Sequence, residues 1–245
     1  MYRLALIIGL VWLSFLSTTA TARETLVLAI GSSPPYHNEQ GTGFYDLLER
    51  EALNRAGYDV RFDTLTGERA LLYANQGISD GEGDRIKGMQ KLYPNLVRVD
   101  EPTVSWDFVA FSHRSDIIIN GWQSIQQYSV GLINGWKIFE RNTKDAQTQT
   151  KVKDIDILFT LLKNKRADLV LMEAWQGLQY LDQHPIPGVK MLVPPLATKN
   201  KYIYLHKKHI NIAPKIAAAL REMKKDGTYK KIVEQVLTPL KKQTK

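Results

Sequence analysis

The sequence predicts an α/β fold in which a sheet is covered by helices. A short apolar run at residues 25–30, closed by a Gly-Ser-Ser-Pro-Pro loop, is typical of a buried strand. Apolar residues then recur at helical spacing from Phe44 to Ala52, and Gly57 supplies a stop signal. The same alternation of strand and helix returns in the second half of the chain, which is the signature of a sheet flanked by helices.

The remaining elements follow in order. A second strand is expected at 59–62 and a short helix at 69–76, ended by Gly77. Further along, the pattern predicts extended segments at 104–111 and 202–205, strands at 129–133, 167–172 and 189–193, and helices at 136–142, 155–163 and 175–181. Two helices close the chain, with Pro214 near the first turn of one and Thr228 as the cap of the other.

Residues 1–22 are expected to form a cleavable signal peptide. Arg3 precedes an apolar run from Leu4 to Leu16, and Ala20-Thr-Ala22 is an A-x-A cleavage site, so the mature chain would begin at Arg23. A retained membrane anchor is the alternative, but the run is shorter than the ~20 residues that a span needs. No later segment is apolar enough to span a bilayer.

Composition points to an exported protein held together by its core alone. The chain has no cysteine, so it has neither disulfides nor a lipidated cysteine, and free residence in a Gram-negative periplasm fits best. The formal net charge is +8, from scattered basic residues. Export argues against a nucleic-acid partner, whereas a mild attraction for anionic solutes remains.

Residues 78–85 combine two glycines with four ionised side chains, namely Asp80, Glu82, Asp84 and Arg85. Glycine allows close approach of the backbone, and mixed charges can recognise a charged ligand, so we expect a ligand-binding loop after a strand that ends near Asp80. A solvated turn is the alternative, because turns also favour Gly, Asp and Ser.

Five motifs occur in order along residues 24–240. They are Ile30-Gly-Ser-Ser-Pro-Pro-Tyr36, Gly43-Phe-Tyr-Asp-Leu47, Asn75-Gln-Gly-Ile-Ser-Asp80, Lys165-Arg-Ala-Asp-Leu-Val-Leu-Met-Glu173, and Ala219-Leu-Arg-Glu-Met-Lys-Lys-Asp-Gly-Thr-Tyr-Lys-Lys-Ile232. Each is weak alone, but their shared order resembles the bacterial extracellular solute-binding proteins of family 3, the polar amino-acid type.

The resemblance implies a two-lobed periplasmic binding protein fold of type II. Lobe one would comprise 23–113 plus 206–245, lobe two 114–199, and the hinge strands would lie near 108–113 and 201–206. The lobes would close over a ligand by hinge bending. The implied function is capture of a small polar solute, such as an amino acid or a related carboxylate or amine, for uptake by an ABC transporter. The protein would be a monomer that meets an inner-membrane permease or receptor, and not an enzyme.

Ligands of open α/β sheets bind beyond the carboxyl ends of the strands. In lobe one, Ser32 could bond the ligand and Tyr36 could stack on it, unless Tyr36 packs inward. Arg85 could hold an anion through two parallel N–H bonds, with Glu82 beside it. The alternative for Arg85 is an internal ion pair with Glu82 or Asp84. The family's downstream T-x-x-R is absent here.

Lobe two offers three more candidates. Trp136 and Lys137 stand where the family has its "G-T-T" helix start, although Trp136 also suits the core and Lys137 also suits solvent. Glu173 occupies the position where the family uses an aspartate for the ligand's ammonium group. Because the family's downstream arginine is also replaced by Arg85, a standard α-amino acid as the ligand is in doubt.

Arg69 and Trp106 are weaker candidates, each as well explained by a structural role.

Two other functions remain open. An enzyme such as a prephenate-type dehydratase shares this fold, and Glu82 and Glu173 could serve acid–base work. Against it, the histidines are isolated, and no zinc spacing or phosphate loop occurs, so we expect no cofactor and no metal. A ligand-sensing protein for a membrane receptor needs the same closed form as a transport protein, and only its partner differs.

Overall fold

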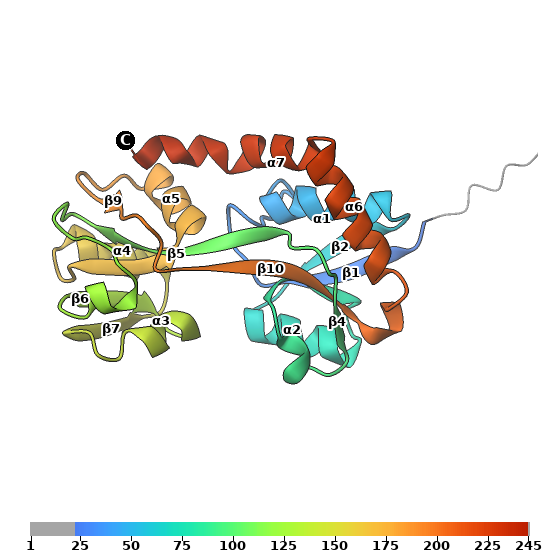
Figure 1. Cartoon of the computed structure of the whole chain (residues 1–245), viewed down its shortest axis with the longest axis horizontal. Coiled ribbons are helices and arrows are strands. Elements are labelled where there is room, and N and C mark those ends of the chain that lie inside the picture. Colours follow the sequence, from blue (N-terminus) through green and yellow to red (C-terminus); the bar gives the residue numbers. More distant parts are fainter. Residues whose placement is uncertain (1–22, 245) are drawn as a thin grey trace, which may run out of the picture.

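A single ten-stranded sheet runs through two α/β halves of the chain (Figure 1). The computed structural model describes residues 23–244, so the signal peptide expected at residues 1–22 lies outside the described residues. The main path of the sheet has the strand order β2-β1-β3-β10-β5-β8-β6-β7, while β4 pairs with β10 and β9 pairs with β5. The strands are β1 (Thr25–Ile30), β2 (Asp59–Thr64), β3 (Gly81–Ile86), β4 (Leu96–Arg98), β5 (Val104–Ser112), β6 (Ser129–Ile133), β7 (Thr148–Val152), β8 (Leu169–Glu173), β9 (Lys190–Met191) and β10 (Ala197–His206).

Seven α-helices within residues 23–244 cover the sheet (Figure 1). They are α1 (Phe44–Arg55), α2 (Gly67–Gln76), α3 (Lys137–Asn142), α4 (Ile155–Lys163), α5 (Ala174–Gln183), α6 (Ala213–Lys225) and α7 (Thr228–Val236). We call β1 to β4 with α1, α2, α6 and α7 the first half, and β6 to β9 with α3 to α5 the second half.

The antiparallel strands β5 and β10 connect the two halves. Val104 to Phe108 pair with Lys201 to Ala197. Beyond this stretch, β5 pairs with β8 of the second half, and β10 pairs with β3 and β4 of the first half. Each long strand therefore belongs to both halves, and their shared register sets how the halves lie against each other.

The charged segment at 81–85 is a strand, which corrects the expectation of a loop. β3 pairs in parallel with β1 and antiparallel with β10, so it lies inside the sheet. Gly81 explains how the polar sequence fits there, because a Cβ at that position would lie 2.5 Å from the carbonyl oxygen of Tyr204. The missing side chain allows β3 and β10 to approach, which sequence periodicity alone cannot reveal.

Most other expected elements are confirmed within one to four residues, and the differences have local causes. Strands β4 and β7 lie at positions where none was expected, and β7 is polar at four of its five positions because it forms an edge of the sheet. Gly227, with φ of 86°, occupies the N-cap of α7 in place of Thr228. Pro214 lies in the first turn of α6, as predicted.

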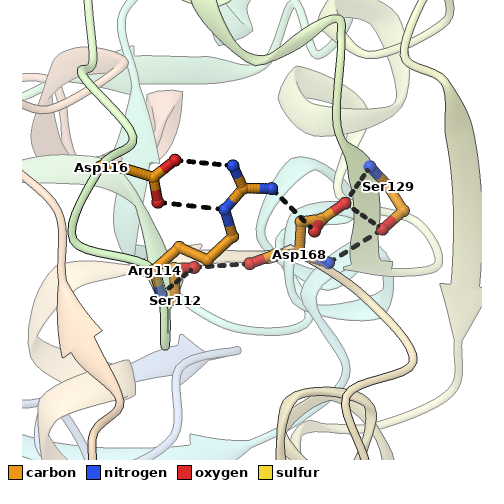
Figure 2. Close-up of polar contacts among 5 residues, drawn as sticks. All are labelled: Ser112, Arg114, Asp116, Ser129 and Asp168. Atoms are coloured by element: carbon orange, nitrogen blue, oxygen red, sulfur yellow. Dashed lines mark hydrogen bonds and ion pairs between the residues drawn. The ribbon is translucent and has the colours of Figure 1, made fainter.

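A polar network fixes the end of β5 in the second half (Figure 2). The Arg114 guanidinium bridges Asp116 and Asp168, with N–O distances of 2.7 and 3.3 Å. The Asp168 carboxylate also accepts from the Ser129 amide at 3.0 Å and the Ser129 hydroxyl at 2.6 Å, while the Ser112 hydroxyl donates to the Asp168 carbonyl. The network thus ties the ends of β5, β6 and β8 together.

The C-terminal segment makes a further crossing between the halves. Helices α6 and α7 pack against α1, and the short helix Thr238–Thr244 then reaches α5 and β9 (Figure 1). Leu240 is buried in the apolar cluster of the second half that includes Phe111 and Leu178, and the Lys241 ammonium lies 5.6 Å from the ring centre of Trp175. Among the described helices, none has the length and apolar character required to cross a membrane.

Gly177 gives a test of how closely α5 packs on β5. A Cβ at this position would lie 2.3 Å from the fully buried Phe111 ring. We expect Gly177→Ala to lower the free energy of unfolding by about 1–2 kcal/mol, because so close a contact puts the overpacking cost at about 2–3 kcal/mol, against a gain of about 1 kcal/mol in helix propensity. Urea unfolding measures this difference. Gln179→Ala, at a half-exposed position of the same helix, is the matched control, and a Gly177→Ala protein as stable as that control would contradict the packing.

Candidate functional site

A cavity of about 1040 Å³ lies where the two halves meet. The first half contributes the loop after β1, the start of α2 and the end of β3. The second half contributes the start of α3, the residues before α4 and one side of α5, while β5 and β10 supply the wall between them. This volume is close to the upper end of the range found for protein pockets that bind small molecules.

Five of the nine residues predicted for the site line this cavity: Ser32, Arg85, Trp106, Trp136 and Lys137. The buried Ser32 hydroxyl has no hydrogen-bond partner within the described part of the chain. A buried polar atom without a partner is costly, and a ligand oxygen or nitrogen would remove that cost. Ser32 is therefore the candidate whose geometry most directly suits ligand contact.

The Arg85 side chain is partly committed to the protein. Its Nε lies 2.8 Å from the Glu82 carboxylate, and its Nη2 donates to the Gly67 carbonyl at 2.5 Å. The ion pair with Glu82, which the sequence offered as the alternative to ligand contact, is therefore present. The Arg85 guanidinium still forms part of the cavity wall. Glu82 itself is fully buried behind the wall, and burial raises the pKa of its carboxyl to about 7 against the opposing charge of Arg85.

Glu173 and Tyr36 contact each other across the two halves instead of lining the cavity. The Tyr36 hydroxyl donates to Glu173 Oε1 at 2.8 Å, and Glu173 Oε2 accepts from the Gln176 amide at 3.0 Å as the N-cap of α5. Both side chains are fully buried, and burial raises the pKa of Glu173 to about 8. A second bond between the halves runs from Gln176 Nε2 to the Ser33 hydroxyl at 2.8 Å.

Arg69 is exposed on α2 and does not line the cavity, although its neighbours Gly67, Glu68 and Leu71 do. The helix places these three residues on one side and Arg69 on another. Lys137 is largely exposed at the rim, where its ammonium pairs with Glu140 at 2.9 Å.

A series of stacked rings passes from the first half into the second. The ring centres are 5.0 Å apart for Tyr45 and Tyr36, 5.1 Å for Tyr36 and Trp106, 6.1 Å for Trp106 and Trp136, and 5.5 Å for Trp136 and Phe139. Each pair is within about 27° of parallel. The sequence left open whether Trp106 and Trp136 contact a ligand or have a structural role. In the structure, both pack with the core and also line the cavity.

Lys201 is a site residue that the sequence reasoning missed. Its ammonium lies 2.7 Å from the Asp84 carboxylate and 3.7 Å from the ring centre of Trp106. Lys199, two residues earlier on β10, lines the same cavity. Side chains two residues apart on a strand point to the same face of the sheet. This spacing is the feature of the sequence that could have indicated both lysines.

Glu49 lies beside the charged strand without a hydrogen-bond partner among the described residues. Both of its carboxylate oxygens are buried, and a Cβ at Gly83 would lie 2.4 Å from Oε2. Burial raises the pKa of Glu49 well above its ordinary value, and the Glu82, Asp84 and Asp46 carboxylates raise it further. No group of three or more histidine, aspartate or glutamate side chains in the described region is arranged to hold a metal ion.

Comparisons with known proteins identify the fold. No protein-family model matches the chain. A Shewanella oneidensis protein, itself uncharacterised, is 27% identical over 198 residues, which cover 78% of this chain and 74% of that protein. An ancestral arginine-binding protein bound to arginine is 25% identical with a TM-score of 0.69, over 87% of this chain and 98% of that one.

A histidine kinase sensor domain with similarity to periplasmic binding proteins is 15% identical with a TM-score of 0.72, over 88% of this chain and 97% of the domain. Together with the two halves joined by β5 and β10, these similarities show that the chain has the two-lobed α/β fold of periplasmic binding proteins, as the sequence resemblance predicted.

The position of Glu49 predicts a pH dependence of stability. The folded protein holds this carboxyl protonated at pH values where the unfolded chain ionises it, so the folded state binds more protons and loses stability as pH rises from about 4.5 through the raised pKa. We expect Glu49→Gln to flatten the decline by up to about 1.4 kcal/mol per pH unit.

Urea unfolding between about pH 5 and 8 measures this effect. The exposed Glu39→Gln is the matched control for loss of one negative charge. Parallel stability curves for the wild type and Glu49→Gln would contradict the assignment.

Proposed function

We propose that this chain is a periplasmic solute-binding protein of the family 3 type, which captures a small polar organic solute by hinge closure. The observation that carries the proposal is the cavity between the two halves, whose wall includes residues from both halves and from the strands that connect them. A ligand in such a position contacts both halves at once, and its binding energy then favours their closed arrangement.

The strand register suggests where the bending would occur. Residues 105–107 and 198–200 pair with each other, whereas 108–111 also pair with the second half and 201–206 with the first. In this proposal, bending occurs in the stretch whose strands have fewest other partners, slightly N-terminal to the hinges expected from the sequence. Lobe one is then the first half, and lobe two is the second half.

The proposed role is delivery of the solute to an inner-membrane ABC permease, after the signal peptide has directed export of the chain to the periplasm. The likeness to an arginine-binding protein supports a solute of the amino-acid, carboxylate or amine class. Reversible binding includes no chemical step, and the similar structures reported above are binding or sensor proteins.

A thermal-shift screen of residues 23–245 against amino acids, small carboxylates, amines and short peptides tests the proposal. A solute at 100 times its dissociation constant should add about 2.7 kcal/mol of stability, because it binds only the folded state. Binding should also change tryptophan fluorescence, since Trp106, Trp122 and Trp136 line the cavity. A screen in which no class of solute raises the melting temperature would contradict the proposal.

Ser32→Ala tests whether the bound solute occupies this cavity. The Ser32 hydroxyl has no partner within the described residues, so its removal should leave the melting temperature of the free protein unchanged or slightly raised. We expect the dissociation constant of a solute found in the screen to rise about fivefold to tenfold, as measured by calorimetry. Ser115→Ala, at an exposed position away from the cavity, is the control. Equal affinities in the two variants would place the solute elsewhere.

A further inference from the structure

The side chains around the cavity carry an excess of positive charge. Three carboxylates line it, from Glu68, Asp84 and Asp154. Six cationic side chains line it, from Arg85, Lys137, Arg141, Lys153, Lys199 and Lys201. A concave site with charges mainly of one sign concentrates the field and attracts solutes of the opposite sign.

The three lining carboxylates are engaged with protein groups. Asp84 pairs with the Lys201 ammonium at 2.7 Å, and Glu68 accepts from the Tyr93 hydroxyl at 2.8 Å. Asp154 caps α4 by accepting from the Ile157 amide at 2.9 Å, and the Lys153 ammonium lies 3.6 Å from it. A ligand ammonium group would thus have to share each of these carboxylates with a protein group that already contacts it.

The two buried carboxylates nearest to the cavity are turned to protein partners as well. Glu82 pairs with Arg85, and Glu173 accepts from the Tyr36 hydroxyl and the Gln176 amide. Neither side chain forms part of the cavity wall. A ligand ammonium would therefore enter a site with an excess of cations whose named carboxylates already contact protein groups, which is unfavourable by desolvation and by repulsion.

Four aromatic side chains form part of the cavity wall, and two of them, Trp106 and Phe108, are largely buried. The other two are Trp122 and Trp136. The Trp106 and Trp136 rings are 18° from parallel with centres 6.1 Å apart, and Phe108 meets Trp136 edge to face at 6.3 Å. Such rings favour contact with another planar or aromatic group.

We propose that the solute is an organic anion that carries a flat apolar group and lacks an ammonium group. This inference rests on the proposed function of reversible solute binding, and it narrows that function to one charge class. The anionic group lies among the lysines and arginines of the wall, and the flat group packs against the tryptophans.

Four matched probes test the inference on the mature protein by isothermal calorimetry: 3-phenylpropanoate, phenylalanine, 2-phenylethylamine and propanoate. The first two differ only by the ammonium group, and the last lacks the ring. We expect 3-phenylpropanoate to bind at least about tenfold more tightly than each of the other three, with 2-phenylethylamine the weakest.

Two variants test separately whether the positive charge and the aromatic wall of the cavity contribute to binding. Lys199→Gln removes a lining cation that forms no ion pair within the described chain, and Trp136→Leu removes part of the aromatic wall. Each substitution should raise the dissociation constant of 3-phenylpropanoate at least about fivefold. Lys190→Gln and Trp175→Leu change the same residue types outside the cavity wall and should leave the affinity unchanged. Lys201 is unsuitable because its loss would leave the buried Asp84 unpaired.

Phenylalanine binding as tightly as 3-phenylpropanoate would overturn the inference while leaving reversible solute binding intact. Equal affinity for propanoate, or a Lys199→Gln variant with unchanged affinity, would also overturn it. If 3-phenylpropanoate fails to bind while an amino acid from the screen binds, the inference is wrong and the proposed function stands. Failure of every solute class would instead remove the proposed function itself.

Discussion

The pairing of β5 with β10 is the constraint on which the rest of the structure depends. These two strands pair with strands of both halves, so their register determines how the two sides of the cavity wall face each other in this structure. They also carry Trp106, Phe108, Lys199 and Lys201 directly into that wall. The elements that connect the halves are therefore also elements of the site, and a ligand bound there contacts the connection itself.

The charged strand β3 illustrates how a sheet can accommodate ionised residues. Glu82 and Asp84 each face a cation, Arg85 and Lys201, at distances of 2.8 and 2.7 Å. Paired charges of this kind keep the cost of burial low only while both partners are present. Glu49 is the exception, since its carboxyl pairs with no cation among the described residues, and burial together with neighbouring carboxylates raises its pKa well above the ordinary value. Buried carboxylates thus lie on and beside the strand that supplies Asp84 and Arg85 to the cavity wall, so changes of charge there affect both stability and the site.

The strands and helices with clear periodicity could be predicted from the sequence, since a strand such as 129–133 or a helix such as 155–163 is set by its own apolar spacing. The loop assigned to 81–85 was wrong because its reason for being a strand is the close approach of Tyr204, a residue far along the chain. Glu173 shows the same limit at the site: a position after a strand can be read locally, but its engagement by Tyr36 depends on how the halves meet. The role of Lys201 could not be predicted locally, because its contacts with Asp84 and Trp106 depend on the pairing of β10 with β3 and β5.

The burial of Leu240 against the second half has a consequence for how the halves can move. Two adjacent strands alone would allow rotation about several axes through their pairing. The short helix Thr238–Thr244 adds a third point of attachment, separate from those strands (Figure 1). Any movement of the halves would therefore have to bend this helix or pull Leu240 out of its contacts, in addition to breaking the Tyr36–Glu173 and Gln176–Ser33 hydrogen bonds. In the proposed hinge bending, the end of the chain would thus limit the movement as well as its middle, although residues 238–244 lie outside every segment that lines the cavity.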